Sequence, residues 1–248
     1  MSARSTDCTL PRWLRAALRP LSARVLHGVL EPFGGNRLLE IGCGAGAELV
    51  VYRRLGWQVE GIEPDRRAAA RCWARGLPVH AGTLADAPPA APFDVVLLSH
   101  VLEHVVEPID LLAGAGARLA AAGKIVVRTP NARALGFALY GSCWFPLDAP
   151  RHVCLFDPRT IRLLARRAGL QPRRVATRPD PRTLSESRHY AHTQGYVLPR
   201  GASARAALLA RAARAERPSH WRRDLFAPLA AVAAWVGRGD VLEAELVR

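Results

Sequence analysis

Two histidines and a glutamate lie close together in the segment SHVLEHV, residues 99–105. His100, Glu103 and His104 have the spacing H-x-x-E-H, in which two histidines of one helix can bind zinc. The preceding residues DVVLL form an apolar run typical of a buried strand, so His100 is expected to end that strand and to lie off the helix. We therefore predict no metal site in this segment.

A glycine-rich turn offers a second kind of chemistry. The segment LLEIGCGAGAEL places Gly42, Gly44 and Gly46 between an expected strand and an expected helix. Glycine lets backbone N–H groups approach a ligand closely, and a helix N-terminus favours anionic groups. Gly42, Gly44 and Ala47 also satisfy the dinucleotide fingerprint G-x-G-x-x-G/A.

An acidic residue strengthens this interpretation. Glu63 lies 21 residues after Gly42, at the end of the second expected strand. A carboxylate in this place can accept both hydroxyls of a ribose. Glu63 and the glycine turn therefore predict a site for an adenosine-containing cofactor, without identifying which one.

Short apolar runs alternate with helical segments rich in alanine and arginine along the chain. Strands are expected at residues 37–43, 58–63, 78–82, 93–99, 124–129, 171–177 and 240–247, and helices at 11–31, 46–55, 65–76, 108–121, 157–169, 202–216 and 225–236. Apolar strands that alternate with helices predict a parallel sheet covered on both faces. The polar residues 180–200 predict a loop.

Composition bounds the class of protein. The 248 residues carry a formal net charge of +14, nearly all from arginine, which suggests a basic surface or a site for an anionic substrate, RNA or membrane. Five cysteines without C-x-x-C spacing argue against a disulfide framework and a cysteine zinc site. No secretory signal is recognisable, and the apolar residues 225–237 are too few to span a bilayer. We expect a cytoplasmic protein in which residues 225–237 pack onto the domain, form a dimer face or contact a membrane surface.

Four segments, in order, resemble the class I S-adenosylmethionine-dependent methyltransferases. They read LLEIGCGAG, VEGIEPD, FDVVLLSHVLEHV and GKIVVRTPN, and they run from about residue 38 to 131. Residues 150–170, PRHVCLFDPRTIRLLARRAGL, resemble the branch with quinone-biosynthesis and sugar or natural-product methyltransferases. The resemblance implies a Rossmann-like, doubly wound fold with a mostly parallel seven-stranded sheet and helices on both faces. It also implies S-adenosylmethionine as the cofactor.

The resemblance assigns roles to single residues. Glu40 matches the acidic position that helps hold the ammonium of the cofactor's methionine, a charge that an NAD domain does not need. Glu63 matches the ribose acceptor. Thr83 stands where the family often has an aspartate that contacts adenine, so backbone groups or Asp86 are the alternatives there. The implied cofactor-binding residues are Glu40, Gly42, Gly44, Gly46, Glu63, Pro64, Thr83, Leu84, Ser99 and His100.

Two histidines are candidates for a general base if the acceptor atom is an oxygen. His100 lies beside the transferable methyl by family resemblance, with pocket packing as the alternative. His152 lies in the loop after the fifth strand, with a structural role in tying residues 131–157 to the sheet as the alternative. Aromatic residues of 131–157 could form an acceptor pocket or a small core of their own; they are Phe137, Tyr140, Trp144 and Phe145.

A single methyltransferase domain is expected over residues 1–248. It would consist of a helical extension (1–31), a cofactor-binding core (37–131), an acceptor-side insertion (131–157) and a C-terminal part (158–248). The expected reaction is methyl transfer to a small molecule, at an oxygen of a sugar, quinone precursor or natural product. The alternatives are an RNA methyltransferase, for which no RNA-binding module is visible, an inactive cofactor-binding scaffold or regulator, and an NAD oxidoreductase.

Overall fold

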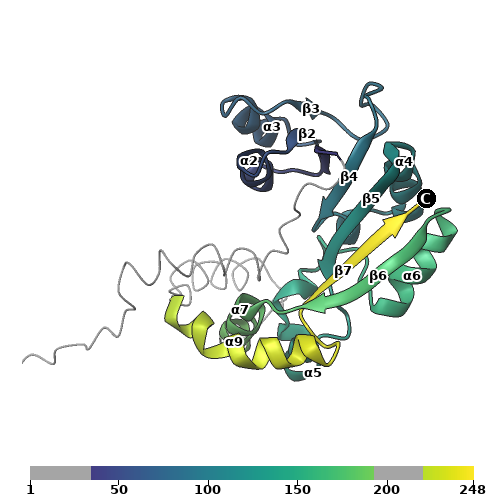
Figure 1. The fold of residues 1–248 in the computed structure, drawn as a ribbon. Coiled ribbons are helices and arrows are strands. Elements are labelled where there is room, and N and C mark those ends of the chain that lie inside the picture. The colour runs from purple at the N-terminus through teal and green to yellow at the C-terminus, as the bar shows by residue number, and fades with distance from the viewer. Residues whose placement is uncertain (1–34, 193–219) are drawn as a thin grey trace, which may run out of the picture. The chain divides into compact units, whose positions relative to one another are not determined.

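One seven-stranded sheet organises the part of the chain that the structure, a computed structural model, describes: residues 35–192 and 220–248 (Figure 1). The strands are β1 (Arg37–Ile41), β2 (Gln58–Glu63), β3 (Val79–Ala81), β4 (Phe93–Ser99), β5 (Leu119–Pro130), β6 (Gln171–Arg178) and β7 (Val241–Val247). The α-helices are α2 (Ala47–Arg54), α3 (Arg66–Trp73), α4 (Pro108–Ala117), α5 (Leu135–Tyr140), α6 (Pro158–Arg167), α7 (Pro181–His192) and α9 (His220–Trp235). The helices expected at 11–31 and 202–216 lie outside the described residues.

The strand order is β3-β2-β1-β4-β5-β7-β6. The first five strands pair in parallel, and β7 runs antiparallel between β5 and β6. The expected seven-stranded, mostly parallel sheet is therefore confirmed. Because the order reverses between β1 and β4, a crevice is expected at the carboxyl ends of these two strands, where such sheets bind ligands.

The alternation of side chains along the strands separates an apolar face from a face that carries charge. Leu39 and Ile41, Val96 and Leu98, and Ile125 and Val127 point to one face, and they pack with buried residues of α4 and α6. The neighbouring positions point to the opposite face, which lies toward α2. Figure 1 shows α2 and α3 on one side of the sheet and α4 and α6 on the other.

The charged face includes ionisable residues near the carboxyl ends of β1 and β5 and at the position of β7 that faces Arg128. Glu40 on β1, Arg128 on β5 and Glu243 on β7 are at most 5% exposed. Their positions alternate with the apolar residues above, so the sheet directs all three toward the same side. Burial of three ionisable groups on one face demands that they be paired.

The prediction of a loop at residues 180–200 is wrong for its first half, because residues 181–192 form α7. Asp180 accepts a hydrogen bond from the backbone N–H of Arg182 at 3.0 Å, and Pro181 stands at the first helical position. Thr183, Leu184, Ser185 and Ser187 are buried, and α7 packs against α9. The polar composition concealed a helix whose buried face is made largely of small hydroxyl side chains.

Helix α9 buries a different face from the one expected. Ala230 and Ala233 are buried, whereas Val232 is 60% exposed and Trp235 is 88% exposed. Of the alternatives for residues 225–237, packing onto the domain is therefore wrong for the large side chains of Val232 and Trp235. Small alanines allow close approach of the helix, and the large apolar residues lie on its outer side.

Core burial in this arrangement predicts the effect of two substitutions. Leu98→Ala should lower the free energy of unfolding by about 2–5 kcal/mol, because Leu98 is fully buried and its truncation leaves a cavity. Leu163→Ala on α6 is the matched control, since Leu163 is 51% exposed. It should change the free energy of unfolding by no more than about 0.5 kcal/mol. Chemical denaturation measures both, and equal losses would contradict the placement of Leu98 in the core.

Candidate active site

The glycine turn lies over the carboxyl ends of β1 and β2. The backbone N–H of Gly42 donates to the carbonyl of Ile62 at 2.7 Å. A Cβ on Gly42, whose φ is +71°, would lie 2.6 Å from a methyl of Val101, so a side chain is excluded there. The space that a Cβ on Gly44 would enter contains no atom within 4 Å. The turn is therefore tightly held beneath and open above, as ligand binding requires.

Glu63 is oriented by the backbone of this turn. One carboxylate oxygen accepts a hydrogen bond from the N–H of Gly44 at 2.7 Å, and the other accepts from the N–H of Asp65 at 2.9 Å. A carboxylate oxygen has two acceptor sites, so each oxygen keeps one for a further donor. Two free acceptor sites on one fixed carboxylate match the two adjacent hydroxyls of a ribose.

Glu40 lies at the neighbouring strand end with part of its hydrogen-bonding capacity unused. The side chain is 3% exposed, and its Oε2 has no hydrogen-bond partner among the described residues. Burial raises the pKa of Glu40 well above its usual value, Glu48 adds to the rise, and Arg128 opposes it. An unpaired buried carboxylate is costly, so this position fits a cationic group of a ligand.

A buried ion network surrounds Glu40 and was not foreseen from the sequence. Arg128 donates to Glu48 at 2.8 Å and to Glu243 at 3.2 Å, and Arg178 also donates to Glu243, at 2.6 Å. Ser99 donates its hydroxyl to Glu48 at 2.8 Å. The signal available in the sequence was the arginine that interrupts the apolar run KIVVRT, since a buried arginine requires carboxylate partners.

The loop after β3 is brought to the same edge. The N–H of Gly82 donates to the carbonyl of Glu63 at 3.1 Å. Asp86 accepts from the N–H of Thr83 at 3.0 Å and from its hydroxyl at 2.7 Å, and these bonds lower the pKa of Asp86. Leu84 packs against the core. Thr83 and Pro64 are exposed, so their side chains remain accessible beside this edge.

The two histidines proposed for catalysis lie in different settings. His100 follows β4 with φ of +57°, is exposed, and places Nδ1 3.1 Å from Glu103. His152 is half-buried, and its Nδ1 lies 2.6 Å from the carbonyl of Pro146. The ring of His152 packs edge-on against the ring of His104, with centroids 4.6 Å apart.

Glu103 holds the segment after β4 to the loop that carries His152. The side chain is fully buried, and its carboxylate accepts from Thr129 at 2.9 Å. Although burial raises the pKa of Glu103, hydrogen bonding from His100 leads the effects that bring it below its usual value. The carbonyl of Glu103 also accepts from the N–H of Val153 at 2.8 Å.

The H-x-x-E-H residues do not share a helix. His100 directly follows β4, whereas Glu103 and His104 lie in the 3-10 helix Leu102–His104. The expectation that His100 lies off the helix is confirmed. The helical zinc motif therefore does not describe this segment.

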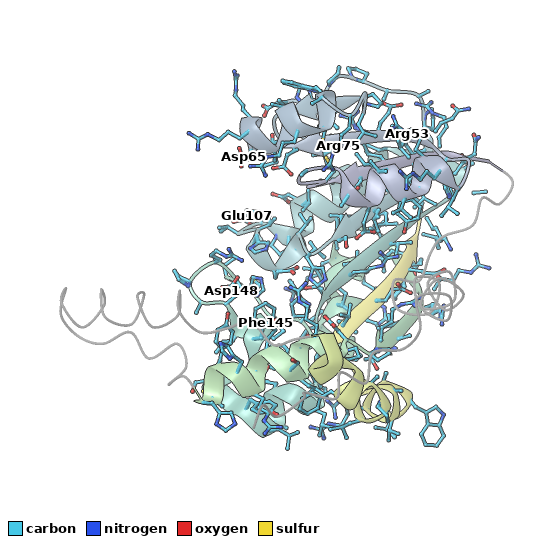
Figure 2. The ribbon with its side chains drawn as sticks, turned by 90° about the vertical axis from the view of Figure 1, so that its left-hand side faces the viewer. Arg53, Asp65, Arg75, Glu107, Phe145 and Asp148 are labelled. Atoms are coloured by element: carbon cyan, nitrogen blue, oxygen red, sulfur yellow. The ribbon has the colours of Figure 1, made fainter. Side chains whose placement is uncertain are left out.

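Some of the acceptor-side residues 131–157 are buried in a small core, and others lie at the surface. Trp144 is fully buried and contacts Phe137, with ring centroids 5.0 Å apart. Phe145 stacks on Tyr190 of α7 at 5.6 Å. Figure 2 shows Phe145 and Asp148 on the same side of the molecule as Asp65 and Glu107, which follow β2 and β4. Part of the insertion therefore forms a small core, and part lies beside the carboxyl edge of the sheet.

Asp240 is a buried acid beside this small core. It is 2% exposed, and among the described residues neither its Oδ1 nor the Nε1 of Trp144 has a hydrogen-bond partner. Both atoms lie 3.1 Å from the point that a Cβ on Gly136 would occupy. Burial and the neighbouring Asp180 raise the pKa of Asp240 to about 7.

Comparison with known protein families identifies the family of this chain. A family model described as a methyltransferase domain matches residues 11–175. The chain belongs to this family. The resemblance to class I S-adenosylmethionine-dependent methyltransferases is thereby confirmed, as is S-adenosylmethionine as the family's cofactor.

Individual relatives agree with this assignment. The chain is 38% identical over 116 residues to a ubiquinone biosynthesis O-methyltransferase of Bradyrhizobium diazoefficiens, covering 44% of this chain and 46% of the relative. It is 34% identical over 154 residues to one of Cereibacter sphaeroides, covering 57% and 62%. The matches thus span about half to three fifths of these relatives' lengths.

Solved structures show the same fold. A methyltransferase from Archaeoglobus fulgidus aligns with a TM-score of 0.54 and 15% identity, covering 95% of this chain and 93% of the other. One from Mesorhizobium loti aligns with a TM-score of 0.54 and 17% identity, covering 92% and 97%. Within the described residues, no helix has the length and apolar character needed to cross a bilayer.

The raised pKa of Asp240 predicts a pH-dependent stability. The folded protein keeps this proton until about pH 7, whereas the unfolded chain releases it near pH 4, so the contribution of Asp240 to stability falls as pH rises between these values. Asp240→Asn cannot ionise, so the stability of the variant relative to the parent should rise over this interval by on the order of 4 kcal/mol and then level off. Denaturant unfolding of both proteins from pH 4 to 8 measures the difference, and a constant difference would contradict the assignment.

Proposed function

We propose that the chain transfers a methyl group from S-adenosylmethionine to an oxygen atom of a small molecule. The observation that carries the cofactor part is Glu40, a buried carboxylate with an unpartnered oxygen beside an open glycine turn. The relatives named ubiquinone biosynthesis O-methyltransferase support oxygen as the acceptor atom and a quinone precursor as the substrate class.

The residues at the carboxyl edge fit the parts of this cofactor. Glu40 would hold the ammonium of its methionine, and Glu63 would accept both ribose hydroxyls. Gly42 and Gly44 would let the backbone approach the ligand. When bound, S-adenosylmethionine supplies a methyl group on a positively charged sulfur, so the protein has chiefly to orient the acceptor and exclude water.

The acceptor would enter from the side of residues 131–157. His152 is suited to remove a proton from a hydroxyl, because Nδ1 donates to the carbonyl of Pro146 and the neutral ring therefore has its lone pair on Nε2. His100 is exposed near the end of β4 and is the alternative base.

Cofactor binding can be tested by substituting one carboxylate on each of two strands, Glu63 on β2 and Glu40 on β1. Glu63→Ala should weaken S-adenosylhomocysteine binding by roughly 10–100-fold, because it removes a charged acceptor of hydrogen bonds worth about 1.5–3 kcal/mol. Glu40→Gln should also weaken binding, since an amide cannot neutralise the ammonium. Calorimetric titration with S-adenosylmethionine, S-adenosylhomocysteine and NAD measures these affinities.

Glu60→Ala is the matched control for this titration. Glu60 lies on the same strand, pairs with Arg37 and has a side chain that is 39% exposed, away from the glycine turn. Its removal should leave cofactor affinity within about twofold of the parent. Binding of NAD by the parent, or no loss in Glu63→Ala, would refute the proposed cofactor site.

The role of His152 predicts a separation of turnover from binding. His152→Ala should lower turnover by about 10²–10⁴-fold, the usual contribution of a general base, while S-adenosylhomocysteine affinity stays near that of the parent. A panel of phenols, catechols and sugars with radiolabelled methyl donor measures turnover. His192→Ala on the exposed end of α7 is the control. Equal turnover in His152→Ala and parent would exclude His152 from the reaction.

A further inference from the structure

A groove with a volume of about 550 Å³ lies over three neighbouring strands of the sheet. Its lining residues are Ala122 and Lys124 of β5, Arg173 and Arg174 of β6, and Glu245 of β7. We propose that this groove binds the phosphate group of a soluble anion. Such a ligand would be neither the cofactor nor the methyl acceptor, and its binding would not depend on the proposed function.

The groove lies away from the cofactor edge. Lys124 precedes Arg128 by four residues on β5, which is roughly 13 Å along a strand, and Glu245 is close to the end of β7. The glycine turn lies instead at the carboxyl ends of the parallel strands. Figure 1 shows the end of β7, marked C, at the opposite end of the sheet from α5, which follows β5. A ligand in the groove would therefore occupy a separate place in the fold.

Two successive arginines line the groove because β6 is irregular beside them. Neighbouring side chains of a regular strand point to opposite faces, so Arg173 and Arg174 would not meet on one side. The register between β6 and β7 shifts between Pro172 and Arg174, which makes Arg173 an extra residue in the pairing. Such a bulge re-aims a side chain, and bulges are frequent near functional sites. The bulge at Arg173 thus places both guanidinium groups on one groove.

The groove has a surplus of positive charge. Lys124 pairs with Glu245 at 3.2 Å, and Arg174 pairs more loosely with the same carboxylate at 3.8 Å. Arg173 has no ion-pair partner among the described residues. Three cations therefore share one carboxylate, which leaves a surplus of two charges. A phosphate monoester carries about −1.5 to −2 charges at neutral pH and matches this surplus.

A neighbouring ion row on the same strands shows how the groove differs from a closed network. Glu243 on β7 binds an arginine of β5 and an arginine of β6, and its side chain is 5% exposed. Glu245 is two residues further along β7 and also lies between a cation of β5 and a cation of β6. The difference is access, because the side chain of Arg174 is 60% exposed. The row of Glu245 is therefore open to a ligand that accepts hydrogen bonds from its arginine.

The donor groups suit phosphate. A guanidinium is planar and presents pairs of N–H groups that match two oxygens of a phosphate. Two guanidinium groups on one groove can therefore bind different oxygens of the same phosphate. The side chains of Lys124 and Glu245 are only 18% and 17% exposed, so they form the floor of the groove. A flat membrane surface would not reach this floor, which favours a soluble anion.

Calorimetric titration of the full chain with pyrophosphate tests the site. In about 0.15 M salt, where exposed charges are screened, the parent should bind one pyrophosphate per chain. Arg173→Ala and Arg174→Ala should each weaken binding by roughly tenfold, because each removes charged hydrogen bonds. The double variant should show no binding at millimolar pyrophosphate.

Glu245→Gln should have the opposite effect. It removes the carboxylate that competes with the anion for Lys124 and Arg174, so the affinity for pyrophosphate should rise by about two- to fivefold. Arg159→Ala is the matched control, because it removes an exposed arginine from the first turn of α6, at the other end of this helix from β6. Its affinity should stay within about twofold of the parent. Thermal unfolding of each variant verifies that the fold is retained.

Vesicles test a lipid headgroup as the source of the phosphate. Sedimentation with phosphatidylcholine vesicles that contain phosphatidic acid should be equal for the parent and the double arginine variant, since only general charge would then act. Sedimentation that is lost in the double variant, together with no binding of pyrophosphate, would overturn a soluble ligand for this groove.

The remaining outcomes separate this site from the proposed function. Absence of pyrophosphate binding, or equal affinity in the parent and both single arginine variants, would overturn the phosphate site. A loss in Arg159→Ala as large as in Arg173→Ala would also overturn it, since net charge would then be responsible. S-adenosylhomocysteine binding by a parent that ignores pyrophosphate would leave the methyltransferase proposal standing, whereas pyrophosphate binding without any cofactor binding would leave only the phosphate site.

Discussion

The pairing of Arg128 is the constraint on which the site end of the sheet depends. A buried guanidinium is stable only when carboxylates surround it, and its partners come from two different elements, α2 and β7. Glu48 also receives the hydroxyl of Ser99, so β4 is included in the same network. Four elements that meet at the carboxyl edge of the sheet are therefore fixed relative to one another by a single side chain. Any shift of α2, which follows the glycine turn, would break the ion pair between Glu48 and the buried Arg128.

Much of the fold could be predicted because its signals are local. The apolar runs at β1, β2 and β4 are long enough to identify buried strands, and the glycines between β1 and α2 mark a turn with positive φ. The count of seven strands depended on resemblance. The placement of β7 between β5 and β6 was not predicted, since pairing across more than 60 residues leaves no local pattern. Helix α7 was missed because serine and threonine serve there as buried residues, against their usual preference.

The site residues that could be predicted are those whose role follows from their position in a local sequence motif. Glu63 could be placed from its distance to Gly42, and the backbone of the turn does orient its carboxylate. The partners of Glu103 could not be found in this way, because His152 and Thr129 are distant in sequence and join it only through the fold. Proximity in the chain suggested His100 and His104 as a pair, but the left-handed backbone at His100 turns the chain between them.

The charges around the cofactor edge do not balance within the network alone. Glu40, Glu48 and Glu243 face two arginines, Arg128 and Arg178, and Glu40 is the carboxylate that retains an oxygen without a described partner. Burial and the neighbouring negative charge raise the pKa of Glu40, so this position favours either a proton or a cation. An ammonium group satisfies the same demand with charge and hydrogen bonds together. The ion network that holds the sheet edge thus leaves Glu40 available for a cationic ligand. The same set of charges therefore stabilises this edge and favours binding of the ligand there.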